Sequence, residues 1–404
     1  MRRLLRTDAR GGEGMILRKL KPEEHGLTRK LWEEVFTEDT KEFLDYYYFI
    51  KTRENQIYVI EEDGGIQSML QLNPYRICLG AEAFPSEYII AVSTRKEYRG
   101  RGYMGQLLRA SMDGMYRVKV PFTFLMPAAE AIYTPYDFRY IYRQKIHIME
   151  CGVQGENGRA RSAEALETAV PAGVSERDAA FFDAEEMAGF FERNFSGRWQ
   201  VYAVRDEEYY RTMILEQQSE HGGVRLLQNG KELVGMFAYT IEEELEIREP
   251  LILPGWEPAF EQAARNLAPS GQDKIKVYGC ADGGTVQEKP AIMARIIHLP
   301  TLLSALRVPA EEELDCSFAV IDPILHENSR VWRLQSMTGE ETVTVRETED
   351  SEGVIPVAEL TELLFGMKSA EEIRMKENAV ITDRLELQLN RIKKLEPVFL
   401  NEVV

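Results

Sequence analysis

The feature that most constrains the fold is a short stretch at residues 88–108, which reads YIIAVSTRKEYRGRGYMGQLL. An apolar run ends at Val92, a basic turn with two glycines follows, and apolar residues at helical spacing resume at Met104. A strand, a tight turn and a helix are therefore predicted in immediate succession. In such a turn, Gly100 and Gly102 allow backbone angles that a Cβ would forbid.

The predicted turn suits an anionic ligand, a pyrophosphate in particular. Backbone N–H groups at the turn and at the start of the helix are unpaired, and the helix dipole adds partial positive charge there. Arg99 and Arg101 add charge in a chain whose net charge is −18. The alternative is a turn that only caps the helix. The pattern is neither a Walker loop nor a dinucleotide fingerprint, because no Gly-Lys-Ser/Thr and no suitably spaced acidic ribose ligand follow.

Composition narrows the classes of partner. A strongly acidic chain argues against general nucleic-acid binding, which needs Lys and Arg to displace counterions, and it is compatible with cationic substrates. The four cysteines and five histidines are scattered, so neither a metal site nor a disulfide framework is expected. No apolar run approaches the roughly 20 residues needed to cross a bilayer. Residues 1–14 lack an apolar signal-peptide core, and we expect a cytoplasmic protein.

The pattern of elements predicts three units of mixed α and β structure. Residues 1–14 are either a non-native extension before a natural start at Met15 or a flexible arm. The first unit, 15–150, contains an amphipathic helix at 22–36, a hairpin turning at Asp63-Gly64-Gly65, and the strand–turn–helix at 88–117. The second, 151–290, repeats this order around an Asn229-Gly230 turn but has no basic glycine turn after a strand. The third, 291–404, has strands followed by helices, which favours an α+β layer.

The turn resembles the acyl-CoA-binding motif of the GCN5-related N-acetyltransferases (GNAT), Arg/Gln-x-x-Gly-x-Gly/Ala, here residues 99–104. The last position departs from the pattern, because Met104 replaces a small residue, and this departure points to the enhanced-intracellular-survival (Eis) family. The segments AAEAIYTPYDFRY (128–140), MARIIHLPTLLSAL (293–306) and DPILHENSRVWRLQ (322–335) resemble further parts of that family. The resemblance implies tandem GNAT-like α/β domains, of which the second has no CoA site, and a C-terminal α+β domain similar to sterol carrier proteins.

The resemblance also implies where an acetyl-CoA cosubstrate would bind. The pantetheine arm would pair with the exposed edge of the fourth strand, and the pyrophosphate would lie on the amides of the turn and of the helix start. The expected cofactor-binding residues are Val92, Ser93, Thr94, Arg99, Gly100, Arg101, Gly102, Tyr103, Met104 and Gly105.

Two catalytic groups follow from the same resemblance. Tyr133 would protonate the leaving sulfur, although it could instead be a packed core tyrosine, and Tyr136 and Tyr140 are rivals for the role. The C-terminal carboxylate of Val404 would hold the acceptor amine and pass its proton through water. The tail, FLNEVV, is apolar enough to dock, and the alternative is an ordered but inert terminus.

The acceptor is expected to be an amine. The family acetylates amines of aminoglycosides and of protein lysines, and acidic side chains could also gather a polyamine. The candidate substrate-binding residues are Glu33, Glu34, Glu38, Asp39 and Glu402, each of which could equally belong to a solvated helix face. The aromatic run at 42–50 either lines an open pocket or is core. The resemblance further implies a homo-oligomer, a hexamer, with no nucleic-acid or membrane partner.

Two other functions stay open at this point. The chain could bind or sense acyl-CoA or a lipid without turnover, and a long apolar tunnel in residues 291–404 would favour that reading. An ordinary protein N-terminal acetyltransferase would leave about the last 250 residues without a role.

Overall fold

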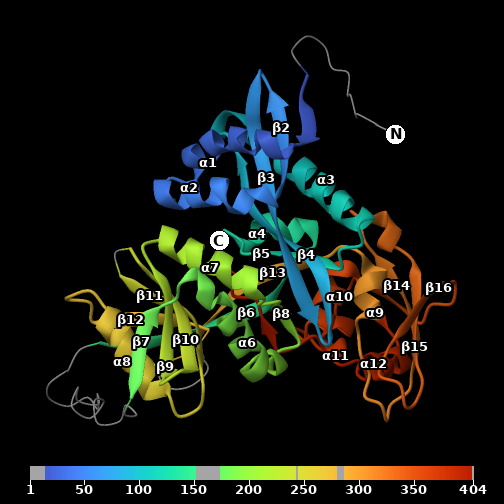
Figure 1. The fold of residues 1–404 in the computed structure, drawn as a ribbon. Coiled ribbons are helices and arrows are strands. Elements are labelled where there is room, and N and C mark those ends of the chain that lie inside the picture. Colours follow the sequence, from blue (N-terminus) through green and yellow to red (C-terminus); the bar gives the residue numbers. More distant parts are fainter. Residues whose placement is uncertain (1–13, 152–172, 243, 280–285, 403–404) are drawn as a thin grey trace.

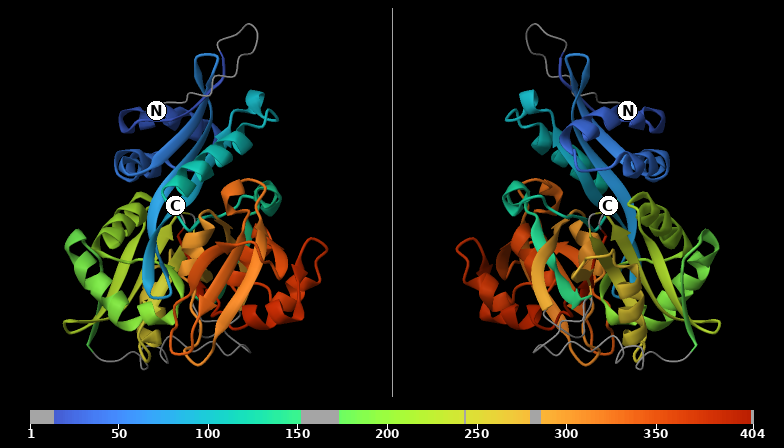
Figure 2. Two further views of the ribbon diagram at one scale, coloured as in Figure 1. Left: turned by 90° about the vertical axis from the view of Figure 1, so that its right-hand side faces the viewer. Right: turned by 90° about the vertical axis from the view of Figure 1, so that its left-hand side faces the viewer.

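The computed structural model describes residues 14–151, 173–242, 244–279 and 286–402. They form three parts, which Figure 1 and Figure 2 show in different orientations. The N-terminal part, coloured blue, stands above the other two, and the green–yellow and orange–red parts lie beside each other beneath it. Residues 1–13, which include most of the predicted extension, lie outside the described ranges.

The first part is a sheet covered on both faces. Its strands are β1 (Ile16–Lys19), β2 (Gln56–Glu62), β3 (Gly65–Leu79), β4 (Glu82–Thr94) and β5 (Phe122–Leu125). Strands β1 to β4 are antiparallel neighbours, and β5 runs parallel to β4. Successive side chains along β2 point to opposite faces of the sheet and show which helices cover each face. Ile57 and Val59 pack with α1 (Arg29–Val35) and α2 (Lys41–Phe49), whereas Tyr58 and Ile60 pack with α3 (Tyr103–Arg117).

Local sequence signals are mostly confirmed in this part. The predicted hairpin turns at Asp63 and Gly64, whose φ angles are 52° and 75°, as a tight two-residue turn requires. The predicted helix at 22–36 begins instead as a 3₁₀ helix, Pro22–Thr28, and becomes α-helical only at Arg29. Gly26 weakens the α-helix there, and the Thr28 hydroxyl donates to the His25 carbonyl, so the tighter winding is favoured.

The second part continues the same sheet. Its strands are β6 (Arg139–Glu150), β7 (Val174–Asp178), β8 (Val201–Ala203), β9 (Gly223–Asn229), β10 (Glu232–Ile241), β11 (Leu245–Ile252) and β12 (Lys274–Tyr278). Its helices are α6 (Ala184–Asn194), α7 (Glu207–Ser219) and α8 (Glu257–Leu267). The predicted turn at residues 229 and 230 joins β9 to β10.

One long strand, β13 (Val286–Ile296), joins the first two parts. It pairs antiparallel with β5 on one side and with β6 on the other. The strands of both parts, together with β13 and the C-terminal strand β19 (Val398–Phe399), thus form one 14-stranded sheet. The predicted domain boundary at residue 290 falls inside this strand. The division into 15–150, 151–290 and 291–404 stays a prediction.

The third part has its own five-stranded sheet. The strands are β14 (Leu314–Ile321), β15 (Val331–Ser336), β16 (Thr344–Thr348), β17 (Gly353–Pro356) and β18 (Val380–Ile381). The helices are α9 (Leu299–Ser304), α10 (Val357–Leu364), α11 (Ala370–Arg374) and α12 (Asp383–Leu389). Its core is continuous with the large sheet, because Phe365 packs edge-on against Phe122 of β5 at 5.4 Å. The predicted mixed α/β and α+β class is confirmed. Among the helices of the described ranges, none qualifies as a membrane span.

Candidate functional site

The site begins where β4 and β5 part. They pair only at Glu87 with Thr123 and at Tyr88 with Phe124. Beyond Tyr88, β4 continues beside β3 alone, so within the described ranges its other edge carries no strand. Unpaired N–H and C=O groups on such an edge are available to an extended ligand. The predicted residues Val92, Ser93 and Thr94 lie on this open edge.

A β-bulge lies in the same segment, and sequence reasoning missed it. The register between β3 and β4 shifts between the pair Gln71–Ile90 and the pair Met69–Ser93. The extra residue is on β4, where Ala91 has a φ of 52°. A non-glycine residue in this region of backbone conformation is uncommon and strained. Bulges re-aim the neighbouring groups, and this one does so at the open edge.

The predicted turn follows directly. Gly100 and Gly102 both have a φ of 77°, and a Cβ added to either would meet nothing within 4 Å. Gly102 is the N-cap of α3, and no side chain caps the helix. The first intrahelical bond runs from the Gln106 amide to the Gly102 carbonyl at 3.2 Å, so the amides of Tyr103, Met104 and Gly105 have no intrahelical partner. The residues expected at a pyrophosphate are therefore brought together.

The basic residues of the turn are held by neighbouring groups. Arg101 lies 3.1 Å from Glu62, whose carboxylate also accepts from the Tyr103 hydroxyl. The Arg99 Nε donates to the Thr94 carbonyl at 3.1 Å, and within the described ranges no carboxylate lies within 4 Å of its guanidinium. Arg99 is therefore the arginine of the turn whose charge has no acidic partner there.

The tyrosines after β5 differ in their surroundings. Tyr133 ends α4 (Glu130–Tyr133) and is buried in the cluster beneath α3, edge-on to Phe138 at 5.8 Å. Burial raises the pKa of Tyr133 to about 12. Its hydroxyl makes no hydrogen bond within the described ranges. The Tyr136 hydroxyl lies against Gly105, where an added Cβ would approach it to 2.5 Å. Tyr140 lies on β6.

The predicted acidic residues are not gathered in one place. Glu33 binds Arg29 at 2.9 Å, Glu34 binds Arg95, and Glu38 is exposed. Asp39 accepts from the Trp32 indole at 2.6 Å, and burial raises its pKa. None of these four lines the cavity described next, whereas Glu402 does. The run at 42–50 is core in part. Phe43, Leu44, Tyr46 and Tyr47 are buried, whereas Phe49 and Ile50 are exposed.

A cavity of about 330 Å³ lies between the first two parts of the chain, at the start of β4. Its wall includes seven carboxylates and three cationic side chains, namely Glu54, Glu87, Asp206, Glu208, Glu216, Glu249, Glu402, Lys51, Arg76 and Arg248. The Lys51 ammonium lies 4.9 Å from the centre of the Tyr75 ring. Burial raises the pKa of Glu216 to about 7, and Lys51 opposes that rise. Within the described ranges, Glu216 has no ion-pair partner within 4 Å.

The C-terminal tail forms one wall of this cavity. Strand β19 (Val398–Phe399) pairs with β8, and Phe399 stacks on Trp199 at 4.2 Å. Asn401 accepts from Gln144 at 2.6 Å. Glu402 lies 3.5 Å from the buried Arg205 and accepts from Tyr209 at 3.2 Å. The second oxygen of Glu402 is buried without a partner in the described part of the chain. Val404, the predicted terminal carboxylate, lies outside the described residues.

Tyr88 follows the cavity residue Glu87 on β4. Burial raises the pKa of Tyr88 above its usual range. Its ring packs on Tyr75 at 6.3 Å and on Phe124 at 5.3 Å. Strand β4 therefore runs from the cavity, past Tyr88 and the bulge, to the glycine turn. Within the described ranges, no group of His, Cys, Asp or Glu is arranged for a metal ion.

Comparison with known proteins identifies two domains in the chain. A family model described as an acetyltransferase (GNAT) domain matches residues 17–141, and one described as a sterol carrier protein domain matches 299–399. The chain therefore contains a GNAT acetyltransferase domain and, after it, a sterol carrier protein domain. The predicted family and enzyme class are confirmed at this level, and the reaction is acyl transfer. No curated protein matches the chain.

Solved structures show that the whole acetyltransferase fold is shared. An Enterococcus faecalis protein described as a "Probable N-Acyltransferase" is 17% identical, with a TM-score of 0.80 over 97% of this chain and 100% of its own. A GCN5-related N-acetyltransferase from Anabaena variabilis is 15% identical, with a TM-score of 0.76 over 96% and 99%. Eis1 from Mycobacterium abscessus is 11% identical, with a TM-score of 0.69 over 96% and 100%.

Proposed function

We propose that the chain moves the acetyl group of acetyl-CoA to a primary amine of a small cationic acceptor, aminoglycoside-like or polyamine-like, or of a lysine side chain. One observation carries the proposal. A single strand, β4, has an open, bulged edge and a glycine turn at one end, and a cavity rich in carboxylates at the other. Donor and acceptor could therefore meet along one strand, near Tyr88 and Tyr133.

The residues present fit the donor. The space over Gly100 and Gly102 is open to phosphate oxygens, and the first amides of α3 are unpaired. We assign the pyrophosphate to the turn at residues 99–105 and the pantetheine arm to residues 92–94. When bound, acetyl-CoA supplies a thioester whose C–S bond breaks as the C–N bond to the amine forms. Main-chain amides beside the Ala91 bulge would hold and polarise the thioester carbonyl.

Tyr133 is assigned as the proton donor to the sulfur. Burial keeps its phenol protonated across the physiological range, and its hydroxyl has no other partner within the described ranges. Tyr136 fits less well, because its hydroxyl is packed against Gly105. The role of the Val404 carboxylate stays a proposal, supported by the anchoring of the tail through Phe399, Asn401 and Glu402.

The cavity is assigned to the acceptor. Its carboxylates outnumber its cations, and an ammonium ion would satisfy the unpartnered oxygen of Glu402 and the unpaired Glu216. Of the predicted substrate-binding residues, this assignment retains Glu402. It gives Glu216 the binding of the acceptor ammonium, which was expected of Glu33 and Glu34. Exclusion of water by Tyr75 and Tyr88 would strengthen both interactions.

The test is release of free thiol from acetyl-CoA against a matched panel of amines. We expect turnover with a polyamine, an aminoglycoside or a lysine peptide, and at least about tenfold less with an amine of similar size that carries carboxylates. Binding of acetyl-CoA without thiol release on any amine would overturn the proposal in favour of an acyl-CoA-binding protein.

The predicted division of the chain and its assembly are also proposed. The matched family segments end at residue 141 and begin at 299, which supports boundaries near 150 and 290. The resemblance to the Eis family supports a homo-hexamer. Sedimentation of the purified chain would distinguish a hexamer from a monomer.

A further inference from the structure

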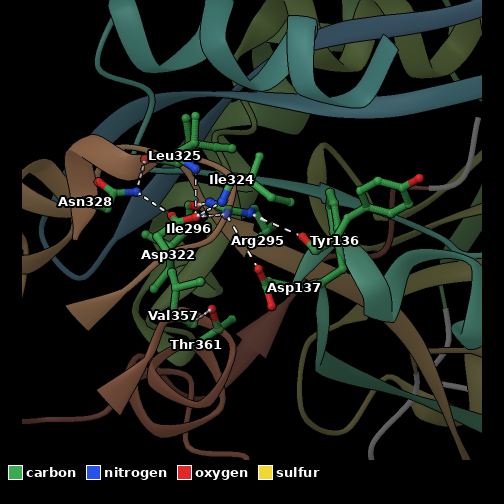
Figure 3. A network of polar contacts seen from close by, with 12 residues as sticks. Tyr136, Asp137, Arg295, Ile296, Asp322, Ile324, Leu325, Asn328, Val357 and Thr361 are labelled. Atoms are coloured by element: carbon green, nitrogen blue, oxygen red, sulfur yellow. Dashed lines mark hydrogen bonds and ion pairs between the residues drawn. The ribbon is translucent and has the colours of Figure 1, made fainter. Parts of the chain in front are cut away.

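A buried charge network connects the sterol carrier domain to the turn that follows Tyr133. Its centre is Arg295 on β13, a side chain with no exposed surface. One guanidinium nitrogen, Nη2, donates to the Asp322 carboxylate at 2.5 Å and lies 3.9 Å from the Asp137 carboxylate. Its Nε donates to the Tyr136 carbonyl at 3.4 Å. Figure 3 shows Arg295 between these groups.

Asp322 is fixed on the side of the carrier domain. One of its oxygens accepts from the amides of Ile324 and Leu325 at 3.0 and 2.8 Å, and the other accepts from Asn328 at 2.9 Å. Asn328 is itself fully buried and donates to the Ile297 carbonyl. The segment DPILHEN thus holds a carboxylate rigidly in front of Arg295.

The other side of the network is the turn between α4 and β6. The Asp137 φ is 64°, so the chain reverses sharply there, and the Phe138 amide closes back on the Tyr133 carbonyl at 3.4 Å. Phe138 packs edge-on against the Tyr133 ring, and the Tyr136 hydroxyl rests against Gly105 at the start of α3. A single short turn therefore contacts Tyr133, the phosphate-binding helix and Arg295.

The carrier domain also packs firmly on the large sheet. Helix α10 contacts β13 and β6, and the apolar interior of the domain forms one cluster with that sheet, including the Phe122–Phe365 contact. The domain is therefore placed to act on the acetyltransferase domain as a fixed support. This placement differs from that of a separate carrier.

We propose that Arg295 and Asp322 are positioning residues for acetyl transfer, through which the sterol carrier domain holds the Tyr133–Asp137 turn in its reactive position. The inference rests on the proposed function, because it gives Tyr133 a role in the reaction. A buried ion pair adds little stability over an apolar pair of equal volume, so its use here is geometric. The guanidinium can hold a carboxylate and a carbonyl at once, which a lysine ammonium on a flexible stem does less well.

The test compares Arg295→Met and Arg295→Lys with Arg333→Lys. Arg333 binds Asp315 through two hydrogen bonds of 2.8 Å in the same domain, far in sequence from the turn. This pair is partly exposed and serves as the control for loss of a two-bond arginine–carboxylate pair away from the turn. The melting temperature of each variant is measured first. The kcat and the KM of acetyl-CoA are then measured at least about 15 °C below that melting temperature. Hydrogen exchange of the amides at 134–138 is measured in parallel.

We expect Arg295→Lys to lower kcat by about ten- to a hundredfold, with the KM of acetyl-CoA within about threefold and faster exchange at 134–138. Arg295→Met should have the same effects. Arg333→Lys should leave kcat, the KM of acetyl-CoA and the exchange at 134–138 unchanged. A wild-type-like kcat in both Arg295 variants, or a loss that disappears on cooling, would overturn the inference while leaving the proposed function intact. If the wild-type chain releases no thiol with any amine, the proposed function fails first, and the positioning role fails with it.

Discussion

The corner β4–α3–β5 of the first part recurs in the second as β11–α8–β12. In each, the first strand is antiparallel to its predecessor, a helix follows, and the next strand is parallel to the first. Each first strand also carries a bulge at a non-glycine residue of positive φ, 52° at Ala91 and 51° at Glu249. The backbone of the proposed donor site is therefore built twice, and the two copies differ in their side chains.

In the second copy, the protein's own side chains fill the bulge and the start of the helix. The Glu249 carboxylate accepts two hydrogen bonds, of 2.7 and 2.8 Å, from the buried Arg205. At the helix start, Glu257 accepts from the Gly255 amide at 2.9 Å, so a carboxylate already lies where a phosphate would bind. In the first copy the bulge residue is alanine and the cap is Gly102. A nucleotide site thus depends on which groups are left out, as much as on the fold.

The largest expected effect tests the filled bulge. Glu249→Gln would leave Glu402 as the one carboxylate within 4 Å of the buried Arg205 guanidinium in the described ranges, so we expect a loss of about 3 to 5 kcal/mol in the free energy of unfolding, measured in urea. Glu220→Gln is the control. Its partner Arg248 is partly exposed, and its loss should cost about 1 kcal/mol or less. Equal losses in the two variants would contradict the view that Arg205 and Glu249 fill the second site.

The next prediction assigns the chemistry to the first copy. Tyr133→Phe removes the proposed proton donor and should lower kcat by about a hundredfold, with the KM of acetyl-CoA nearly unchanged. Tyr278→Phe on β12 removes a hydroxyl that donates to Glu246 and should leave kcat unchanged. If thiol release by the Tyr133 variant is as fast as in the wild type, Tyr133 is a core residue.

The third prediction gives the first copy the acidic helix start of the second. Gly102→Asp places a carboxylate at a residue of φ 77° beside the proposed pyrophosphate. Strain and repulsion together should cost about 2 kcal/mol of binding, a rise of roughly thirtyfold in the KM of acetyl-CoA. Gly255→Asp imposes similar strain at φ 90° in the second copy and should not change that KM. A rise in both variants would mean that general distortion is responsible.

The smallest expected effect concerns Glu216, a residue that the second part contributes to the proposed acceptor cavity. Glu216 on α7 lines the acceptor cavity, and burial raises its pKa to about 7. Its carboxylate is largely protonated below that pH and ionised above it, so the KM of a cationic acceptor should fall as pH rises from about 6 to 8. Glu216→Gln should raise this KM about tenfold at pH 8 and flatten its pH dependence. Glu207 is partly exposed and does not line the cavity, so Glu207→Gln should behave as the wild type. An unchanged profile in the Glu216 variant would exclude Glu216 from the acceptor site.

Local signals in the sequence predicted the donor corner well. The glycines of the turn, the hairpins and the periodicity of α3 act over a few residues, and each appears in the structure as expected. The bulge at Ala91 could not be predicted, because it lies in an unbroken apolar run where no alternation reveals a shift in register.

The acceptor side could not be derived from the sequence, because it depends on contacts between distant segments. Lys51, Glu216 and Glu402 come from three remote places in the chain and meet only in the fold. Glu33 and Glu34 looked suitable as a pair, yet each is bound to an arginine, and Arg95 reaches Glu34 across 61 residues. Arg295 lies in the segment 293–306, which resembles the family, but no role for it could be predicted because its partners lie on two other segments.

Strand β13 has a consequence for how the chain is made. Strands β5 and β6 leave the ribosome by residue 150, but the strand that lies between them ends only at Ile296. At about 5–20 residues per second, the nascent protein waits roughly 7 to 30 seconds with that gap unfilled. Strand β12, the other neighbour of β6, also follows only at Lys274–Tyr278, so one edge of β5 and both edges of β6 are available for wrong partners during this interval.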